Sequence, residues 1–236
     1  MNKFEKALTN PFIKYMNRLF WLFVVNFMFC LLSVLTLFVL FVPGLVSLHT
    51  IAYKMVNNDC DKNPVIIFFE EIKIQWSFSW RLEVLTMSIL LVAGALYYFD
   101  WLYIYHNTYD WFVWFSIIFI SVFLLVGISI FTHLLTFNNY IKDDTFKMMI
   151  KKSALITGKK FLKTLLNIAI LISFVVVLYL IPYLIPFISF AFYAYIVEAI
   201  NKKMYSEIAK EELERMCLEE NLFLPTVVEE KENKDE

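Results

Sequence analysis

The sequence predicts an all-α protein, a polytopic bundle of transmembrane helices. Of its 236 residues, 60% are hydrophobic and only 18% are charged, whereas soluble domains are about 45–50% apolar and about 25% charged. Three long stretches also carry almost no charge. Residues 19–53 and 164–197 have none, and residues 84–141 have only Asp100 and Asp110. Because one membrane-spanning helix needs about 20 apolar residues, each stretch is long enough for at least one span.

The composition also excludes several classes of protein. The 21 basic and 22 acidic residues leave a net charge of −1, which argues against binding to nucleic acid. The high apolar content excludes a disordered chain. With only four glycines, the chain has no room for the Gly-rich loops that cradle phosphates in nucleotide-binding enzymes.

The basic residues predict how the chain lies across the membrane, since Lys and Arg collect in cytoplasmic loops. Residues 1–18 carry four of them, residues 54–81 four, residues 142–163 seven and the segment from residue 201 onward six. The short connection between Asp100 and Asp110 therefore has none. We expect this connection to lie outside and the other four polar segments to lie in the cytoplasm.

This arrangement requires residues 19–53 and 164–197 to cross the membrane twice each. Turn-forming residues lie where the two bends are needed, at Pro43-Gly44 and between Pro182 and Pro186. We therefore expect three helical hairpins, with six spans over residues 19–42, 44–57 (short), 82–99, 111–136, 164–181 and 186–200. The alternative has five spans, with residues 19–42 crossing once and the N-terminus outside.

Each hairpin follows a basic, partly apolar segment that is typical of a helix lying on the cytoplasmic membrane surface. Asn10-Pro11 and Asn63-Pro64 are favoured helix starts, with the asparagine as cap and the proline as first helical residue. The segment 142–163 is expected to anchor the topology through its lysines. A sharper hypothesis is that it docks a cytoplasmic partner through apolar anchors: Phe146, Met149, Ile150 and Phe161.

The chain divides into a membrane domain, residues 1–205, and an acidic cytoplasmic tail, residues 206–236. Residues 207–236 hold 11 of the 22 acidic residues. Residues 207–221 are expected to form a short helix, and residues 228–236 a solvated, disordered end. No secretory signal peptide is expected, because the first apolar run is too long and lacks a small-residue cleavage site.

Nothing in the sequence points to a catalytic, cofactor or metal site. The three cysteines form no C-x-x-C pair, and the three histidines fit no metal-binding spacing. The candidate functional residues are instead polar side chains within the spans, which are costly to bury in lipid: His49, Asn26, Ser33 and His133. We expect hydrogen bonding between helices, with transport as the alternative role. Glu83 and Glu198 are expected near the inner boundary, reaching water or pairing with Arg81 and Lys202.

Several short motifs occur in a familiar order. They are Asn10-Pro11-Phe12 before the first span, Asn26 and Ser33 within it, Pro43-Gly44, Ala52-Tyr53, the run Phe69, Ile72, Lys73, Gln75 and Trp76, and Asp100 at a span end. In this order the chain resembles the YesL-like family of bacterial membrane proteins. The resemblance covers about residues 8–205. It implies a multispanning protein often encoded among carbohydrate uptake and breakdown genes, with no assigned activity and no catalytic residues.

These observations together predict a non-enzymatic protein of the bacterial cell membrane, with both termini in the cytoplasm. The resemblance favours an accessory component of carbohydrate uptake. Its expected partners are the lipid bilayer and either importer subunits or a second copy of the chain, with no cofactor and no nucleic acid. The alternative is a small transporter or permease subunit. A membrane enzyme has no supporting residues.

Overall fold

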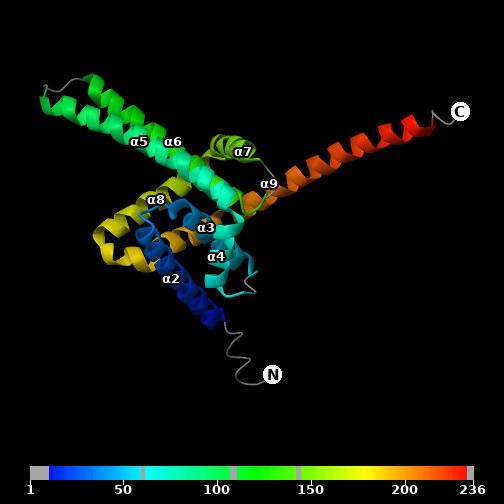
Figure 1. Cartoon of the computed structure of the whole chain (residues 1–236), viewed down its shortest axis with the longest axis horizontal. Helices are drawn as coiled ribbons and strands as arrows, with labels where there is room; N and C mark the ends of the chain where they lie inside the picture. Colours follow the sequence, from blue (N-terminus) through cyan, green and yellow to red (C-terminus); the bar gives the residue numbers. More distant parts are fainter. Residues whose placement is uncertain (1–10, 60–61, 107–110, 142–144, 233–236) are drawn as a thin grey trace, which may run out of the picture.

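A computed structural model describes residues 11–59, 62–106, 111–141 and 145–232, with side chains described as far as residue 211. The regular elements in these ranges are all helical, which confirms the predicted all-α class (Figure 1). They are α2 (Pro11–Leu35), α3 (Phe41–Asn57), α4 (Pro64–Ile74), α5 (Trp76–His106), α6 (Trp111–Phe137), α7 (Phe146–Lys159), α8 (Phe161–Leu180), the 3₁₀ turn η1 (Pro182–Leu184) and α9 (Ile185–Glu232).

Five of these helical segments are long and apolar enough to cross a membrane. They are most of α2, all of α5, α6 and α8, and the stretch from η1 into α9 that ends at Glu211. Most of their apolar side chains face away from the rest of the chain, as Leu91 of α5 and Phe119 of α6 do. Such outward-facing apolar surface is what lipid requires. The five helices indicate a multi-pass membrane protein.

Helix α3 differs from these five because it lies inside the protein. It has 17 residues, about 25 Å at 1.5 Å per residue, and eleven of them are buried. It packs against α2, α4, α5, α6 and α9. Because other helices cover it on most sides, α3 can carry polar side chains that a lipid-facing helix could not.

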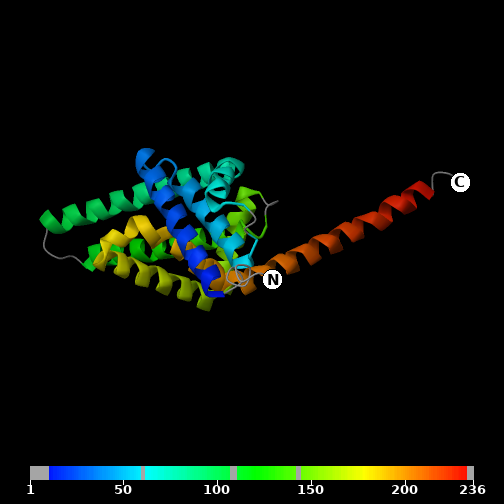
Figure 2. The same ribbon diagram turned by 90° about the horizontal axis from the view of Figure 1, so that it is seen from below.

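The helices are grouped in consecutive pairs. Helix α2 packs against α3, α5 against α6, and α8 against α9. The α5–α6 pair forms a long arm that points away from the other helices (Figures 1 and 2). Helix α9 first runs beside α2 and α3 and then leaves the bundle on the opposite side from the tip of that arm.

The first bend is not at Pro43-Gly44, as the sequence suggested, but at residues 36–40. There, Leu37 and Phe38 adopt positive φ angles of 50° and 66°. Pro43 is the third residue of α3, where the N–H that proline lacks would have no partner within the helix. Gly44 instead permits a close contact. A Cβ at this position would lie 2.5 Å from Cδ2 of Phe29 in α2.

Two other start and stop signals are confirmed. The second bend occupies Ile181 and η1, so that it falls at the expected proline-rich segment. Helix α4 starts at Pro64, and the Asn63 side chain caps it by accepting a hydrogen bond of 3.0 Å from the Val65 N–H. Helix α2 starts at Pro11, but its expected cap, Asn10, lies outside the described residues.

Helix α9 extends much further than expected, for 48 residues without a break. The predicted boundary at residue 205 and the short helix at 207–221 both fall inside it. Residues 187–224 contain neither Gly nor Pro, so nothing in this stretch favours a helix end. Residues 228–232 belong to the same helix, and the rest of the predicted disordered end, 233–236, lies outside the described residues.

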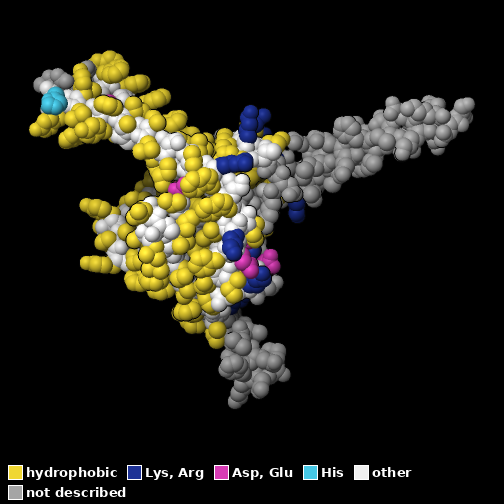
Figure 3. Space-filling view, viewed as in Figure 1, with side chains coloured by type: hydrophobic (Ala, Val, Ile, Leu, Met, Phe, Trp, Pro, Cys, Tyr) yellow, Lys and Arg dark blue, Asp and Glu magenta, His cyan; other side chains and the backbone are white. Residues whose placement is uncertain are grey.

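Basic side chains gather on one side of the face that Figure 3 shows. The Lys and Arg side chains lie near α4, α7 and the point where α9 leaves the bundle, with mostly apolar side chains over the opposite side. The tip of the α5–α6 arm carries exposed aromatic residues such as Trp101 and Trp111. The fold therefore separates a charged end from an apolar end, along the direction in which the helices would cross a membrane.

Candidate functional site

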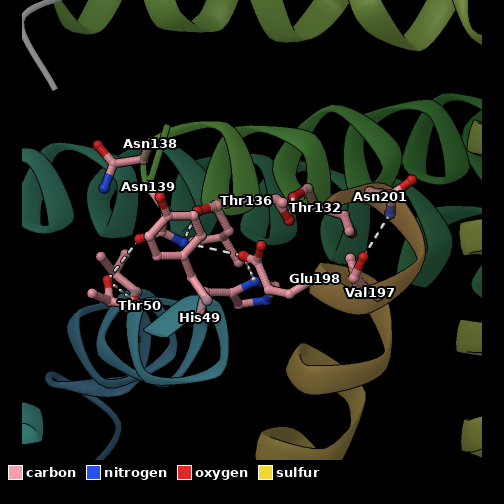
Figure 4. Close-up of polar contacts among 12 residues, drawn as sticks. His49, Thr50, Thr132, Thr136, Asn138, Asn139, Val197, Glu198 and Asn201 are labelled. Carbon is pink, nitrogen blue, oxygen red and sulfur yellow. Dashed lines mark hydrogen bonds and ion pairs between the residues drawn. The ribbon is translucent and has the colours of Figure 1, made fainter. Parts of the chain in front are cut away.

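The most polar part of the interior is where α3 meets α9. His49 of α3 is 1% exposed and Glu198 of α9 is fully buried, and His49 Nδ1 lies 3.3 Å from Glu198 Oε1. Figure 4 shows the two side chains directed toward each other from neighbouring helices. A buried carboxyl group is costly without a hydrogen-bond partner, and His49 provides one.

Asn139, just after the end of α6, joins this pair to a second residue of α3. Its Nδ2 donates a hydrogen bond of 3.1 Å to Glu198 Oε1, and its Oδ1 accepts one of 2.8 Å from the Thr50 hydroxyl. Thr50 follows His49 directly in α3, and all four side chains are buried. One cluster, His49, Thr50, Asn139 and Glu198, thus ties together α3, α6 and α9.

A chain of hydrogen bonds continues from this cluster toward the charged end of the molecule. Gln75, after α4, donates to Thr50 Oγ1 at 3.2 Å and to Glu71 Oε2 at 2.8 Å. Glu71 of α4 forms an ion pair with Lys54 of α3, whose Nζ donates to Glu71 Oε1 at 2.9 Å. The Lys54 side chain is 27% exposed, so the chain of contacts runs from a fully buried acid to a partly solvated lysine.

Amide side chains interrupt this path as a route for protons. Asn139 separates Glu198 from Thr50, and Gln75 separates Thr50 from Glu71. An amide donates and accepts hydrogen bonds but does not titrate. The arrangement therefore fits a fixed set of links between helices better than a relay that moves protons between titratable groups.

Glu198 nevertheless retains free bonding capacity. Its Oε2 atom has no hydrogen-bond partner among the described residues, and the same holds for the nearby Asn201 Oδ1. Asn201 lies one turn further along α9, where it donates to Asn167 of α8 at 2.9 Å and to the Val197 carbonyl at 2.8 Å. Buried acceptors without donors are uncommon. The Oε2 atom of Glu198 is therefore the place in the interior that could bind a proton or a small cation.

A second histidine links α6, α8 and α9. His133 of α6 is fully buried and contacts the Tyr205 hydroxyl of α9 through Nδ1. Its Nε2 lies 3.0 Å from the Thr164 hydroxyl of α8. The ring is thus engaged at both nitrogens. This geometry favours the role that the sequence suggested first for His133, hydrogen bonding between helices.

Asn26 also serves as a helix link. Its Nδ2 donates to the Ile185 carbonyl and its Oδ1 accepts from the Ala191 N–H, each at 3.0 Å. Both groups belong to the first turns of α9, so Asn26 fixes α2 against that end of the helix. Ser33 is 3% exposed, and its hydroxyl has no partner among the described residues.

The two acids expected at the membrane boundary have different partners from those predicted. Glu83 of α5 does not reach water. It is 4% exposed and accepts a hydrogen bond of 2.7 Å from the Val42 N–H at the start of α3. Helix α3 has no side-chain cap of its own, and a carboxylate at a helix N-terminus is favourable. Glu198 pairs with His49, while Lys202 donates to the Val56 carbonyl at 3.4 Å.

The predicted docking anchors, three in α7 and Phe161 at the start of α8, mostly pack inside the chain. Met149 is 2% exposed in a cluster with Val42 and Leu134, against which Phe146 and Ile150 also pack. Their helical spacing correctly indicates an apolar face, but that face is covered by this chain's own helices. Only Phe161, which is 60% exposed, remains available as a surface residue.

Sequence reasoning missed the pairing of His49 with Glu198 and the part played by Asn139. A usable signal was the stripe of residues spaced three or four apart along α9: Ala191, Ala194, Glu198, Asn201 and Tyr205. All five are buried. Small residues at this spacing let helices approach closely, so an acid in the same stripe faces protein.

Among the described residues, no three His, Cys, Asp or Glu side chains are placed to hold a metal ion. No family model matches the sequence, and no curated protein or solved structure matches it either. The resemblance to the YesL-like family therefore stays a prediction from short motifs.

Proposed function

We propose that this chain is a non-enzymatic protein of the bacterial cell membrane that crosses it six times, keeps both termini in the cytoplasm and acts as an accessory component of carbohydrate uptake. In this proposal α3 is the sixth crossing. It is short, but the surrounding helices shield it from lipid. Helices α4 and α7 lie at the cytoplasmic surface.

The separation of charge supports this orientation. The Lys and Arg side chains visible in Figure 3 lie at one end of the bundle, and cytoplasmic segments are enriched in these residues. Exposed Trp101, Tyr105 and Trp111 occur at the far end of the α5–α6 arm, as expected for aromatic residues at the other membrane interface.

The observation that carries the accessory role is the course of α9 beyond the bundle. Residues 212–232 continue the helix by about 30 Å and run away from the other helices (Figures 1 and 2). Most helical stability in proteins comes from tertiary packing, so a partner that packs on this segment would stabilise it. The hydrogen bonds that Asn139 and Gln75 make between helices favour a rigid structural role over that of a carrier that changes conformation. The association with carbohydrate uptake rests on the family resemblance.

Co-purification tests this proposal. The full chain and a variant ending at Glu211 are tagged at the N-terminus, expressed in native membranes and purified in mild detergent, with equal membrane insertion checked for both. We expect importer subunits to accompany the full chain and to be lost from the shortened one. Recovery of the full chain without any transporter subunit, or equal recovery of partners with both chains, would contradict the accessory role.

A second candidate, a small transporter, is favoured by one observation: the Glu198 carboxylate is buried and has one oxygen without a partner. In a transporter this acid would bind the coupling ion. Glu198→Gln keeps the size and the hydrogen bond from Asn139 but replaces the titratable acid by an amide. If the chain transports, this variant should lose uptake in proteoliposomes while Glu70→Gln, an exposed acid on α4, should not. Unchanged uptake in Glu198→Gln would refute the transporter.

A further inference from the structure

A cavity of about 290 Å³ opens at the charged end of the bundle, between the start of α2, the end of α3 and the start of α4. This volume is close to the lower end of the range for small-molecule pockets. The lining residues that matter here are Lys14, Arg18 and Trp21 of α2, Asn58 after α3, and Lys62 and Asn63 before α4. Three segments that are distant in sequence thus contribute to one pocket.

The pocket is strongly cationic. Lys14, Arg18 and Lys62 all line it, and among the described residues no Asp or Glu does. Within the described part of the chain, Lys62 pairs with Glu70, whose carboxylate lies 3.0 Å from Lys62 Nζ. Both side chains of that pair are largely exposed, and an exposed pair of this kind is held weakly. Lys62 therefore remains able to turn to a ligand.

Arg18 is held in position rather than free. Its guanidinium donates to Asn58 Oδ1 and to the Tyr195 hydroxyl of α9, the latter at 3.5 Å. Asn58 itself adopts a left-handed conformation, with φ of 60°, where α3 ends. A guanidinium oriented in this way loses little freedom on binding, and its planar set of N–H donors suits phosphate oxygens.

Lys14, Arg18 and Trp21 follow one another at intervals of four and three residues, so they share one face of α2. The adjoining face is apolar and uncovered, with Tyr15 60% and Leu19 41% exposed. A phosphate in the pocket would therefore have apolar helix surface directly beside it, as the headgroup of a lipid requires.

We propose that this pocket binds a phosphate group. The adjoining apolar face of α2 favours the headgroup of an anionic phospholipid as its source, and a soluble phosphate is the other source of the same chemistry. This site is separate from the cluster around Glu198 and does not depend on the accessory role.

The test uses the full chain purified in detergent, with two probes: a fluorescent phosphatidylglycerol followed by anisotropy, and radiolabelled inorganic phosphate followed by equilibrium dialysis. The pocket variant is Lys14→Gln with Lys62→Gln, which spares Arg18. The control is Lys147→Gln with Lys151→Gln, two exposed lysines of α7 that remove the same charge from the same end. Matching thermal transitions establish that both variants fold.

We expect saturable binding that weakens about tenfold or more in the pocket variant, since hydrogen bonds to charged groups are each worth about that factor, and less than about twofold in the control. If excess inorganic phosphate does not displace the bound lipid, the site is assigned to a lipid headgroup. Displacement by phosphate, with direct binding of the radiolabel, assigns it to a soluble phosphate. An equal loss in both variants, no loss in the pocket variant, or no saturable binding of either probe would overturn the proposal.

Discussion

Gly44 offers the sharpest test of how α3 is packed, because its lack of a side chain permits the close approach of α2. A Cβ added at Gly44 would lie 2.5 Å from Phe29 Cδ2 and 2.7 Å from Phe29 Cε2, whereas carbon atoms in contact are about 3.5–4.0 Å apart. The Phe29 ring cannot simply swing away, since it is 1% exposed and packs against Phe41 and Phe190. Gly44→Ala should therefore force α2 and α3 apart or displace the ring.

The magnitude follows from two opposing effects. Overpacking a filled core costs about 1–3 kcal/mol, while replacing Gly by Ala inside a helix gains about 1 kcal/mol. Gly94→Ala and Gly127→Ala are matched controls, because no atom lies within 4 Å of a Cβ built at either position. They gain the helix propensity without the clash. The difference between Gly44→Ala and either control should thus be about 1–3 kcal/mol in the free energy of unfolding.

Thermal unfolding in detergent, followed by tryptophan fluorescence at a fixed heating rate, measures this difference. We expect Gly44→Ala to unfold several degrees below both controls. Phe29→Leu in the Gly44→Ala background should recover part of the loss, because the smaller side chain removes the clashing ring atoms. A Gly44→Ala protein as stable as the controls would show that α2 and α3 do not meet at this point.

Four further substitutions test the links between helices by the same unfolding assay. Glu83→Gln should lower stability by about 0.5–2 kcal/mol, since it removes the negative charge that caps α3 at Val42, and equal stability would rule out that cap. Asn26→Ala should cost about 0.5–1.5 kcal/mol for each of the two hydrogen bonds to the backbone of α9 that it removes. Phe146→Ala should cost about 2 kcal/mol, part of the about 3–5 kcal/mol for a fully buried phenylalanine, whereas the exposed Phe161→Ala should change stability by under about 0.5 kcal/mol. Equal effects of these last two would contradict the packing of α7.

Local signals in the sequence predicted much of this fold. The absence of charge located the long helices, and Asn63-Pro64 located the start of α4 with its cap. The first bend was misplaced because Pro43-Gly44 is as compatible with the first turn of a helix as with a loop. The actual bend, at Leu37 and Phe38, has two apolar residues with positive φ, which no turn propensity favours. Only the packing of α3 against its neighbours selects that position.

The candidate site was predicted in part. His49, Asn26 and His133 are buried polar residues that join helices, as expected from their position within apolar stretches. The partner of His49 could not be predicted from linear order, since Glu198 is separated from it by 149 residues. The same limit applies to α7. Its spacing indicates an apolar face at Met149, but whether that face meets this chain or another depends on tertiary contacts.

The orientation of the bundle is the central claim, and labelling of single cysteines in intact cells tests it most directly. In a chain without its native cysteines, His106→Cys, Lys14→Cys and Lys159→Cys place one thiol at the tip of α5, at the start of α2 and at the end of α7. An impermeant maleimide should label only His106→Cys, and the other two only after permeabilisation. Labelling of both Lys14→Cys and His106→Cys in intact cells, without labelling of Lys159→Cys, would favour five spans. Labelling of Lys159→Cys in intact cells, with His106→Cys protected, would contradict the cytoplasmic placement of the charged end.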